Sequence, residues 1–241
     1  MFIMNIALIG YGRMGHEIEA MAIERGHTIK LKIDVDNIRD LVHENFREVD
    51  VAIEFSSPES AFGNVMKCLG MQKPVVSGTT GWLKDYDKAT EMCMKVGTSF
   101  IHSANFSVGV NILFALNSYL ARIMEQHKAY TPLIEEIHHA RKLDAPSGTA
   151  IVLAESIIDQ HGELEGWCFE SSMTKNCLPI RSVREGTVPG THTVEWDSDI
   201  DSIGLKHVAK SRKGFALGAI LAAEYISGRK GVFTMKDVLG F

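Results

Sequence analysis

The sequence predicts an α/β protein with two domains: a doubly wound parallel sheet, and a second α+β domain built on a mostly antiparallel sheet. Three observations support this prediction. Short apolar runs alternate with helical patterns through the first half of the 241 residues. A glycine-rich turn follows the first apolar run. Strand-like runs dominate the second half. We expect residues 1–106 and 214–241 to form the first domain, and residues 107–213 to form the second.

The first half is predicted to alternate between strands and helices. The expected strands cover residues 3–9, 28–33, 49–55, 74–77 and 99–103. The expected helices cover residues 15–25, 58–69 and 83–96. Since parallel neighbours need long crossover connections, helices between successive strands indicate a parallel sheet. The apolar start at residues 1–10 runs directly into a glycine turn, so we expect a strand there rather than a signal peptide.

The second half changes character after one long amphipathic helix at residues 111–126. The apolar residues on its shared face are Ile112, Leu113, Leu116, Leu120 and Ile123. Strands are expected at residues 132–138, 166–170, 178–184, 191–197 and 203–209, with a single helix at residues 149–160. A last apolar helix at residues 215–227 is expected to return to the first domain and make that domain discontinuous in sequence.

Composition excludes several classes of function. The net charge is only −5, which argues against nucleic acid as a partner, and no segment approaches the ~20 apolar residues of a membrane span. The four cysteines, Cys68, Cys93, Cys168 and Cys177, show no Cys-x-x-Cys spacing. We therefore expect reduced thiols, no disulfide framework, no metal site and a cytoplasmic location.

A dinucleotide signal begins at the end of the first predicted strand, where residues 10–15 read G-Y-G-R-M-G. In such a turn the first glycine permits the bend, the second lets the backbone approach a pyrophosphate, and the third allows close helix packing. Asp34 ends the second predicted strand, where a carboxylate can accept hydrogen bonds from ribose hydroxyls. The alternative is a simple glycine turn beside a solvated aspartate. The predicted cofactor contacts here are Gly10, Gly12, Arg13, Met14, Gly15 and Asp34.

Two more turns follow strands of the same predicted sheet, at the edge where open α/β sheets bind ligands. Gly78, Thr79 and Thr80 lie in the sequence S-G-T-T-G, for which a plain turn is almost as good an explanation. Phe55 ends the third strand and could pack on a flat ring, although a core phenylalanine is the commoner outcome. We predict cofactor contacts from all four residues.

The most informative stretch is residues 136–150, E-I-H-H-A-R-K-L-D-A-P-S-G-T-A. Histidine has an ordinary pKa of about 6.5, so His138 or His139 can hold or give a proton near neutrality, while Lys142 supplies a fixed cation. Ser147, Gly148 and Thr149 open an apolar helix, and helix starts attract anions. A polar loop with a helix cap is the alternative, but it leaves the histidines and the lysine unexplained.

Taken together, these residues closely resemble 4-hydroxy-tetrahydrodipicolinate reductase, the dihydrodipicolinate reductase of bacterial lysine and diaminopimelate synthesis. The stretch at residues 136–150 fills every fixed position of the family signature E-x-H-H-x-x-K-x-D-x-P-S-G-T-A. Further matches are G-T-T-G at residues 78–81, A-N-F-S-V-G at 104–109, R-E-G at 184–186, S-R at 211–212 and F-A-L-G-A at 215–219. The resemblance covers nearly the whole chain.

The resemblance implies an amino-terminal Rossmann-type domain, a central sheet domain that binds a small dicarboxylate substrate, and a homotetramer. It implies that NADH or NADPH delivers hydride to C4 of the substrate, with His138 as proton donor and Lys142 as a second catalytic candidate. His139, Ser147, Gly148 and Thr149 are the expected substrate contacts. It adds three expected cofactor contacts, Ala104, Asn105 and Phe106.

Some features of the sequence leave the cofactor preference and the function open to more than one interpretation. The glycine motif is one residue shorter than in many family members. Asp34 is followed by Val35 and Asp36 rather than by the arginine that can meet a 2′-phosphate, so we expect NADH to be used at least as well as NADPH. The basic residues from Lys206 to Lys213, including Arg212, fit a binding cluster and a solvated loop equally well. Two other functions are considered, an NAD-dependent amino-acid dehydrogenase and a non-catalytic dinucleotide sensor.

Overall fold

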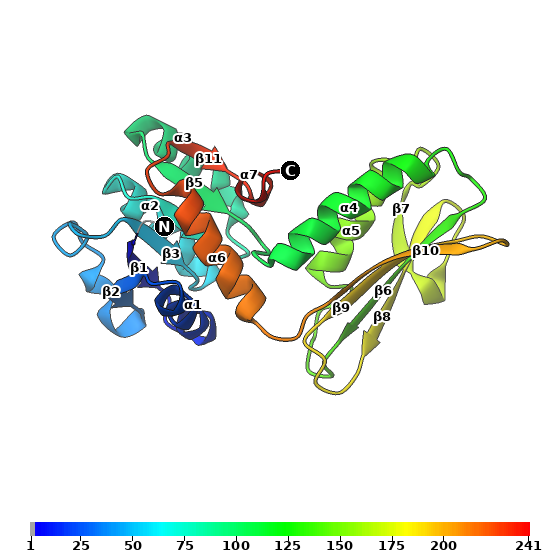
Figure 1. Cartoon of the computed structure of the whole chain (residues 1–241), viewed down its shortest axis with the longest axis horizontal. Helices are drawn as coiled ribbons and strands as arrows, with labels where there is room; N and C mark the ends of the chain where they lie inside the picture. Colours follow the sequence, from blue (N-terminus) through cyan, green and yellow to red (C-terminus); the bar gives the residue numbers. More distant parts are fainter. Residues whose placement is uncertain (1–2) are drawn as a thin grey trace. The chain divides into compact units, whose positions relative to one another are not determined.

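The computed structural model describes residues 3–241, so Met1 and Phe2 of the apolar start lie outside the described residues. The chain divides into two compact units (Figure 1). The first comprises Met1–Val108 and Arg212–Phe241, and the second comprises Gly109–Ser211. In the part of the chain that the structure describes, no helix is both long and apolar enough to cross a membrane.

The first unit is built on a six-stranded parallel sheet with the strand order β11-β5-β4-β3-β1-β2. The strands are β1 (Asn5–Ile9), β2 (Thr28–Ile33), β3 (Val51–Glu54), β4 (Val75–Ser77), β5 (Ser99–His102) and β11 (Gly231–Phe233). The first five confirm the predicted strands to within two residues at each end. The three-residue strand β11 was not predicted, because it is too short to show a periodic pattern.

Helices cover both faces of this sheet, as the alternation of strand side chains requires. Ile6 and Leu8 pack on the face covered by α1 (Arg13–Glu24), α6 (Lys213–Ile226) and α7 (Met235–Leu239). Ala7 and Ile9 face α2 (Pro58–Gly70) and α3 (Tyr86–Val96). Short 3₁₀ turns precede α3 (η2, Leu83–Asp85) and follow β2 (η1, Val35–Asp40). The doubly wound α/β class is confirmed, and the last long helix, α6, packs on the sheet of the first unit.

The second unit is a five-stranded sheet in the order β10-β9-β6-β8-β7. Its strands are β6 (Thr131–His138), β7 (Gly166–Phe169), β8 (Cys177–Arg184), β9 (Thr191–Asp197) and β10 (Ser202–Val208). The β9 strand pairs antiparallel with β6 and β10, whereas β8 pairs parallel with β6 and β7. The sheet is therefore mixed rather than mostly antiparallel. The crossover through α5 (Gly148–Ile158) allows β6 and the later strands β7 and β8 to run in the same direction.

One face of this sheet is covered by α5 and by α4 (Val108–Met124) (Figure 1). The buried side chains of β6 alternate with partly exposed ones, so Ile134 and the even-numbered residues around it face the helices. Ile180 of β8 and Trp196 of β9 belong to the same apolar cluster. Every second side chain of β6 therefore lies under the helices, and polar residues as well as apolar ones occupy these enclosed positions.

The cysteine prediction was wrong in part. Cys168 and Cys177 form a disulfide, with their Cα atoms 6.0 Å apart, whereas Cys68 and Cys93 are free and buried. The parallel pairing of β7 with β8 sets Gly166 opposite Cys177 and brings Cys168 beside it. Nothing in a nine-residue separation reveals that pairing, because it arises from the sheet register.

Candidate active site

The predicted cofactor residues lie in the loops that follow the strands of the first unit. Gly10 has φ of +89°, and a Cβ there would lie 2.0 Å from the carbonyl oxygen of Phe55. A Cβ on Gly15 would lie 2.6 Å from the Gly10 oxygen. Gly12, at the N-cap of α1, has no atom within 4 Å of the position a Cβ would take. The fold therefore demands Gly10 and Gly15, whereas Gly12 leaves open space at a helix start, which suits a phosphate.

The loops after β3, β4 and β5 pack against one another. A Cβ on Gly78 would lie 2.1 Å from the ring of Phe55, and that ring lies 5.9 Å from the ring of Phe106. A Cβ on Gly218 in α6 would lie 1.6 Å from the Phe106 oxygen. Phe55 is half-buried among these groups, while Thr80 and Ala104 are exposed and Asn105 is half-buried. The structure thus brings the predicted residues of these three loops to one edge of the sheet.

A buried carboxylate that sequence reasoning missed orders this edge. Glu54, the last residue of β3, has no exposed surface. Its Oε1 accepts hydrogen bonds from the Ser56 backbone N–H at 3.0 Å and from Thr79 Oγ1 at 2.8 Å, and its Oε2 accepts one from Ser77 at 2.7 Å. Thr79 is consequently a buried structural residue whose hydroxyl fixes two loops together. An acidic residue ending an otherwise apolar strand was the signal that could have indicated this role.

Asp34 also has a local structural role. Its Oδ1 accepts a hydrogen bond from the Val35 backbone N–H at 2.9 Å, and its own N–H donates to Asn37 Oδ1 at 2.8 Å. This capping box starts η1 directly after β2. The side chain of Val35 is 82% exposed. Val35 and Asp36 therefore present no cation where the resemblance would place an arginine, and the next basic side chain is the exposed Arg39 in the last turn of η1.

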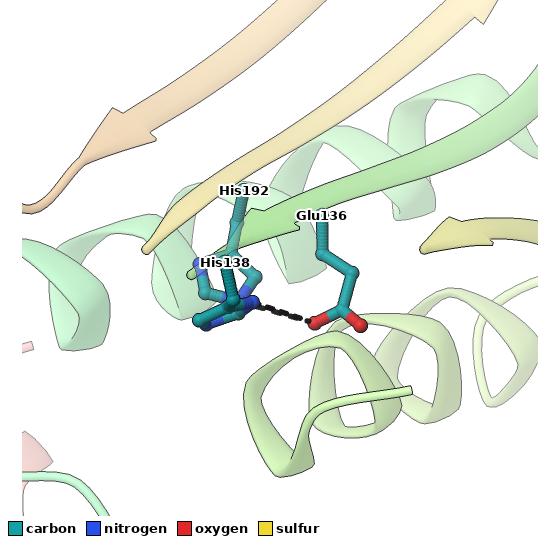
Figure 2. Close-up of side chains that lie close together, drawn as sticks. All are labelled: Glu136, His138 and His192. Carbon is teal, nitrogen blue, oxygen red and sulfur yellow. Dashed lines mark ion pairs between the residues drawn. The ribbon is translucent and has the colours of Figure 1, made fainter. Parts of the chain in front are cut away.

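The second unit brings together a group that spans three strands and one helix start; Figure 2 shows its members from β6 and β9, Glu136, His138 and His192. The sheet register sets Glu136 of β6 opposite His192 of β9 and sets His138 opposite Arg184 of β8. Glu136, His138 and His192 are all buried. His138 Nδ1 lies 3.2 Å from Glu136 Oε2, and the two imidazole rings are 5.1 Å apart, edge to face.

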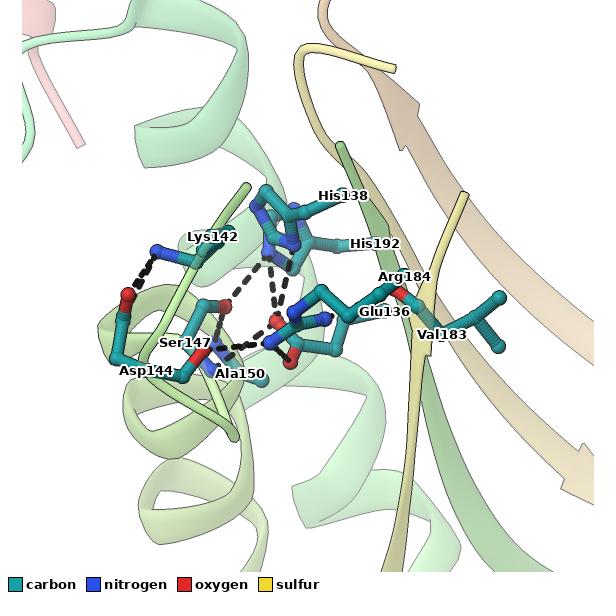
Figure 3. Close-up of polar contacts among 9 residues, drawn as sticks. All are labelled: Glu136, His138, Lys142, Asp144, Ser147, Ala150, Val183, Arg184 and His192. Atoms are coloured by element: carbon teal, nitrogen blue, oxygen red, sulfur yellow. Dashed lines mark hydrogen bonds and ion pairs between the residues drawn. The ribbon is translucent and has the colours of Figure 1, made fainter. Parts of the chain in front are cut away.

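Glu136 is the centre of this group (Figure 3). Its Oε2 also accepts a hydrogen bond from the Ser147 backbone N–H at 3.0 Å, and its Oε1 accepts one from Arg184 Nη2 at 2.9 Å. Burial by itself would raise the pKa of this carboxyl, but the polar groups of His138, Ser147, Arg184 and Ser182 around it hold the pKa well below the ordinary value. The carboxylate is therefore ionised throughout the physiological range.

His192 provides a neutral neighbour to this carboxylate. Its Nε2 lies 3.1 Å from the Ser147 hydroxyl and 4.0 Å from Glu136 Oε2. Burial, followed by repulsion from His138, lowers the pKa of His192 to about 4. His207, opposite it in β10, also has a lowered pKa through burial. Sequence reasoning did not select His192, although it occupies a core-facing position in a strand.

The loop between β6 and α5 carries the other predicted residues. Lys142 Nζ donates to both carboxylate oxygens of Asp144, at 2.7 and 2.8 Å. The backbone oxygen of Asp144 accepts a hydrogen bond from Arg184 Nη2 at 2.6 Å, which connects this loop to the Glu136 group. His139 is half-buried beside His138.

The start of α5 completes this part of the site. Ser147 is its N-cap, and the Ser147 hydroxyl accepts a hydrogen bond from the Ala150 N–H at 3.3 Å. Gly148 is exposed and Thr149 half-buried in the first turn. The structure thus brings His138, the loop that carries Lys142 and the start of α5 together around one ionised carboxylate, Glu136, which sequence reasoning did not select.

Comparison with known proteins shows the family of this chain. The model of the dihydrodipicolinate reductase N-terminus matches residues 4–106, and the model of its C-terminus matches residues 109–239. The chain belongs to the dihydrodipicolinate reductase family. A curated 4-hydroxy-tetrahydrodipicolinate reductase from Christiangramia forsetii is 53% identical over 236 residues, which cover 98% of each chain. One from Neisseria gonorrhoeae is 34% identical and covers 92% of this chain and 84% of the relative.

Solved structures confirm the fold of this reductase family member. A dipicolinate-bound dihydrodipicolinate reductase from Paenisporosarcina sp. TG-14 has a TM-score of 0.80 at 20% identity and covers 97% of this chain and 98% of that one. An amine dehydrogenase from Mycobacterium smegmatis has a TM-score of 0.57 at 9% identity, covering 96% and 95% of the two chains. The second similarity concerns the fold alone, so it gives no support to the amino-acid dehydrogenase alternative.

Three side chains can also be compared with a metal site. Among the described residues, Glu136, His138 and His192 offer ligand atoms that all lie within 4.8 Å of one another. Both oxygens of Glu136 already accept hydrogen bonds from Ser147 and Arg184. This carboxylate is satisfied without an ion, so we retain the expectation that the reductase site needs no metal.

Proposed function

We propose that this reductase family member converts 4-hydroxy-tetrahydrodipicolinate to tetrahydrodipicolinate and water in lysine and diaminopimelate biosynthesis. The observation that carries the proposal is the group in the second unit: His138 beside an ionised carboxylate, with Lys142 and the start of α5 next to it. A reduction that adds hydride to one carbon must also protonate its neighbour, and a histidine can donate that proton near pH 7.

The pyridine nucleotide, NADH or NADPH, is proposed to bind along the loop edge of the first unit. The open space at Gly12 and the helix start of α1 suit its pyrophosphate, with Arg13 exposed beside them. The end of β2 at Asp34 suits the adenosine ribose. When bound, the nicotinamide would supply the hydride that C4 of the substrate accepts as the 4-hydroxyl is lost as water. We expect NADH to serve at least as well as NADPH, because Val35 and Asp36 offer no cation to a 2′-phosphate.

The substrate is a small dicarboxylate, and we assign its anionic groups to three features. Lys142 is the cation among them, and it would exchange its ion pair with Asp144 for one with a substrate carboxylate. Gly148 and Thr149 lie in the first turn of α5, where the helix dipole favours an anion. His139 lies next to His138 and is the remaining substrate contact. His138 then donates the proton, and Lys142 is the second catalytic candidate.

The direct test is oxidation of NADH and NADPH, followed at 340 nm with the freshly formed condensation product of aspartate semialdehyde and pyruvate. We expect turnover by the wild type, and a loss of about 100-fold or more in His138→Ala with cofactor affinity retained. No turnover by the wild type would reject the reductase, and turnover of an amino acid with NAD instead would support the dehydrogenase alternative.

The homotetramer and the cytoplasmic location stay predictions. Light scattering coupled to size exclusion tests the assembly, and a monomer at micromolar concentration would contradict it.

A further inference from the structure

The proposed reaction assigns no step to the buried carboxylate of Glu136, yet this carboxylate lies at the centre of the polar group in the second unit. It accepts hydrogen bonds from Ser147 in the β6–α5 loop and from Arg184 in β8. Its Oε2 lies 3.2 Å from Nδ1 of His138. A buried ionised group needs polar partners to offset the cost of its burial, whereas a hydrophobic core is stable without any such group. Its position beside the proton donor therefore calls for a functional explanation.

The geometry distinguishes the two nitrogens of His138. Nδ1 is buried and lies 3.2 Å from Glu136 Oε2, an ion-pair contact, with no hydrogen bond of regular geometry to any described residue. Nε2 lies on the other side of the ring, where the Cβ that Gly190 lacks would come within 3.1 Å of it. An imidazole beside a carboxylate keeps a hydrogen on the nitrogen that faces the carboxylate, and this fixes both the tautomer and the ring orientation.

We propose that Glu136 is a positioning residue for the reaction: its carboxylate holds a hydrogen on Nδ1 of His138 and leaves Nε2 as the atom that donates the catalytic proton. The proposal rests on the proposed function only in naming His138 as the donor. In the step itself, the N–H bond at Nε2 breaks and a C–H bond forms at the substrate carbon next to C4. The electron pair of that N–H bond stays on Nε2, so His138 becomes neutral with its remaining hydrogen on Nδ1.

The neighbouring charges favour this assignment. Arg184 fixes the Glu136 carboxylate from β8 and also holds the backbone oxygen of Asp144, so the strand and the loop that carries Lys142 are connected through one guanidinium. His192 on β9 stays neutral near pH 7, as its lowered pKa of about 4 shows. His207 on β10 has a lowered pKa as well. Glu136 is therefore the anion that determines the hydrogen position on His138.

The first test needs no activity. Nitrogen NMR of protein labelled with ¹⁵N-histidine, with His138→Gln used to assign the resonances, reports which ring nitrogen carries hydrogen in the neutral form. We expect hydrogen on Nδ1 of His138 in the wild type, opposite to the preference of free imidazole side chains. Hydrogen on Nε2 would overturn the proposal, whatever the enzyme catalyses.

The second test compares Glu136→Gln with Glu125→Gln, a matched control in which another glutamate of the same unit lies 3.7 Å from a histidine, His161. We expect Glu136→Gln to lower kcat about 10- to 100-fold and to displace its pH profile, with NADH affinity unchanged. Glu125→Gln should leave all three unchanged. A Glu136→Gln enzyme with kcat within about twofold of the wild type and the same pH profile would overturn the proposal.

The NMR and kinetic experiments test the role of Glu136 and the reductase function separately. If the wild type shows no turnover of the proposed substrate, the reductase function fails while the NMR result still decides the role of Glu136. If Glu136→Gln does not fold, the wild-type NMR measurement again decides. If turnover is normal and the hydrogen lies on Nε2, the reductase stands and the positioning role is rejected.

Discussion

Alanine substitutions at Gly10 and Gly12 should separate what the dinucleotide loop does for the fold from what it does for the ligand. At Gly10 a Cβ would lie 2.0 Å from the Phe55 oxygen, and φ is +89°. A left-handed conformation costs an alanine about 1–2 kcal/mol, and the overlap adds about 1–3 kcal/mol through displacement of the β3 end. We expect Gly10→Ala to lose about 3 kcal/mol of stability, which lowers Tm by roughly 6–12 °C for a chain of this size.

At Gly12 we expect alanine to reduce ligand affinity more than stability. No atom lies within 4 Å of the missing Cβ, and φ and ψ are −82° and −154°, in the extended region open to other residues. Alanine is a poorer N-cap than glycine by under about 1 kcal/mol, so Tm should fall by no more than roughly 4 °C. A methyl group there would hold the pyrophosphate away from the backbone, so we expect NADH affinity to fall at least about 10-fold, or ~1.4 kcal/mol.

Differential scanning fluorimetry and titration of protein fluorescence with NADH measure both quantities. Gly15→Ala serves as an intermediate case, because its Cβ would lie 2.6 Å from the Gly10 oxygen. The reasoning is refuted if Gly12→Ala binds NADH within twofold of the wild type, or if it is destabilised as much as Gly10→Ala.

Three further predictions concern pH, metal and cofactor. The pKa of His192 is about 4 in the fold against an ordinary 6.5, so the unfolded chain takes up its proton first as pH falls. Stability should therefore decline between pH 6.5 and 4 by up to about 3 kcal/mol, and urea unfolding of His192→Gln should show a flatter decline. Overnight EDTA dialysis should leave turnover unchanged, because Glu136 is satisfied without an ion; a loss restored by zinc would contradict this. NADPH should not be preferred over NADH by more than roughly 100-fold, about 2.7 kcal/mol, and Val35→Arg should shift the ratio towards NADPH.

Much of the fold could be predicted because its signals are local. Alternating apolar runs and helical periods located the principal strands and helices of both units, often to within two residues. Elements with too few residues for a period were missed, as with β11 and α7. The predicted helix at residues 83–96 begins instead with the separate turn η2, since Trp82 is anchored by its Nε1 hydrogen bond to the Thr79 oxygen. The last case shows a tertiary contact deciding a local boundary.

The pairing of the strands could not be predicted from local sequence patterns. The second sheet is mixed because the crossover through α5 makes β8 parallel to β6, and the Cys168–Cys177 disulfide arises from the parallel pair β7 and β8. Hydrophobic alternation is the same in parallel and antiparallel strands that have one covered face, so the sequence pattern could not distinguish them.

The missed site residues nevertheless left a signal in the parity of their strands. In β9, Val194 and Trp196 are the core-facing residues, and His192 continues their alternation at the strand start. Glu136 and His138 continue the core-facing series of β6 in the same way. A strand that places polar residues at core-facing positions must satisfy them with partners from neighbouring strands, because burial without partners is costly. Parity therefore selects His192, Glu136 and His138 as buried polar residues without knowledge of the register, and only the choice of partner for each group requires the folded sheet.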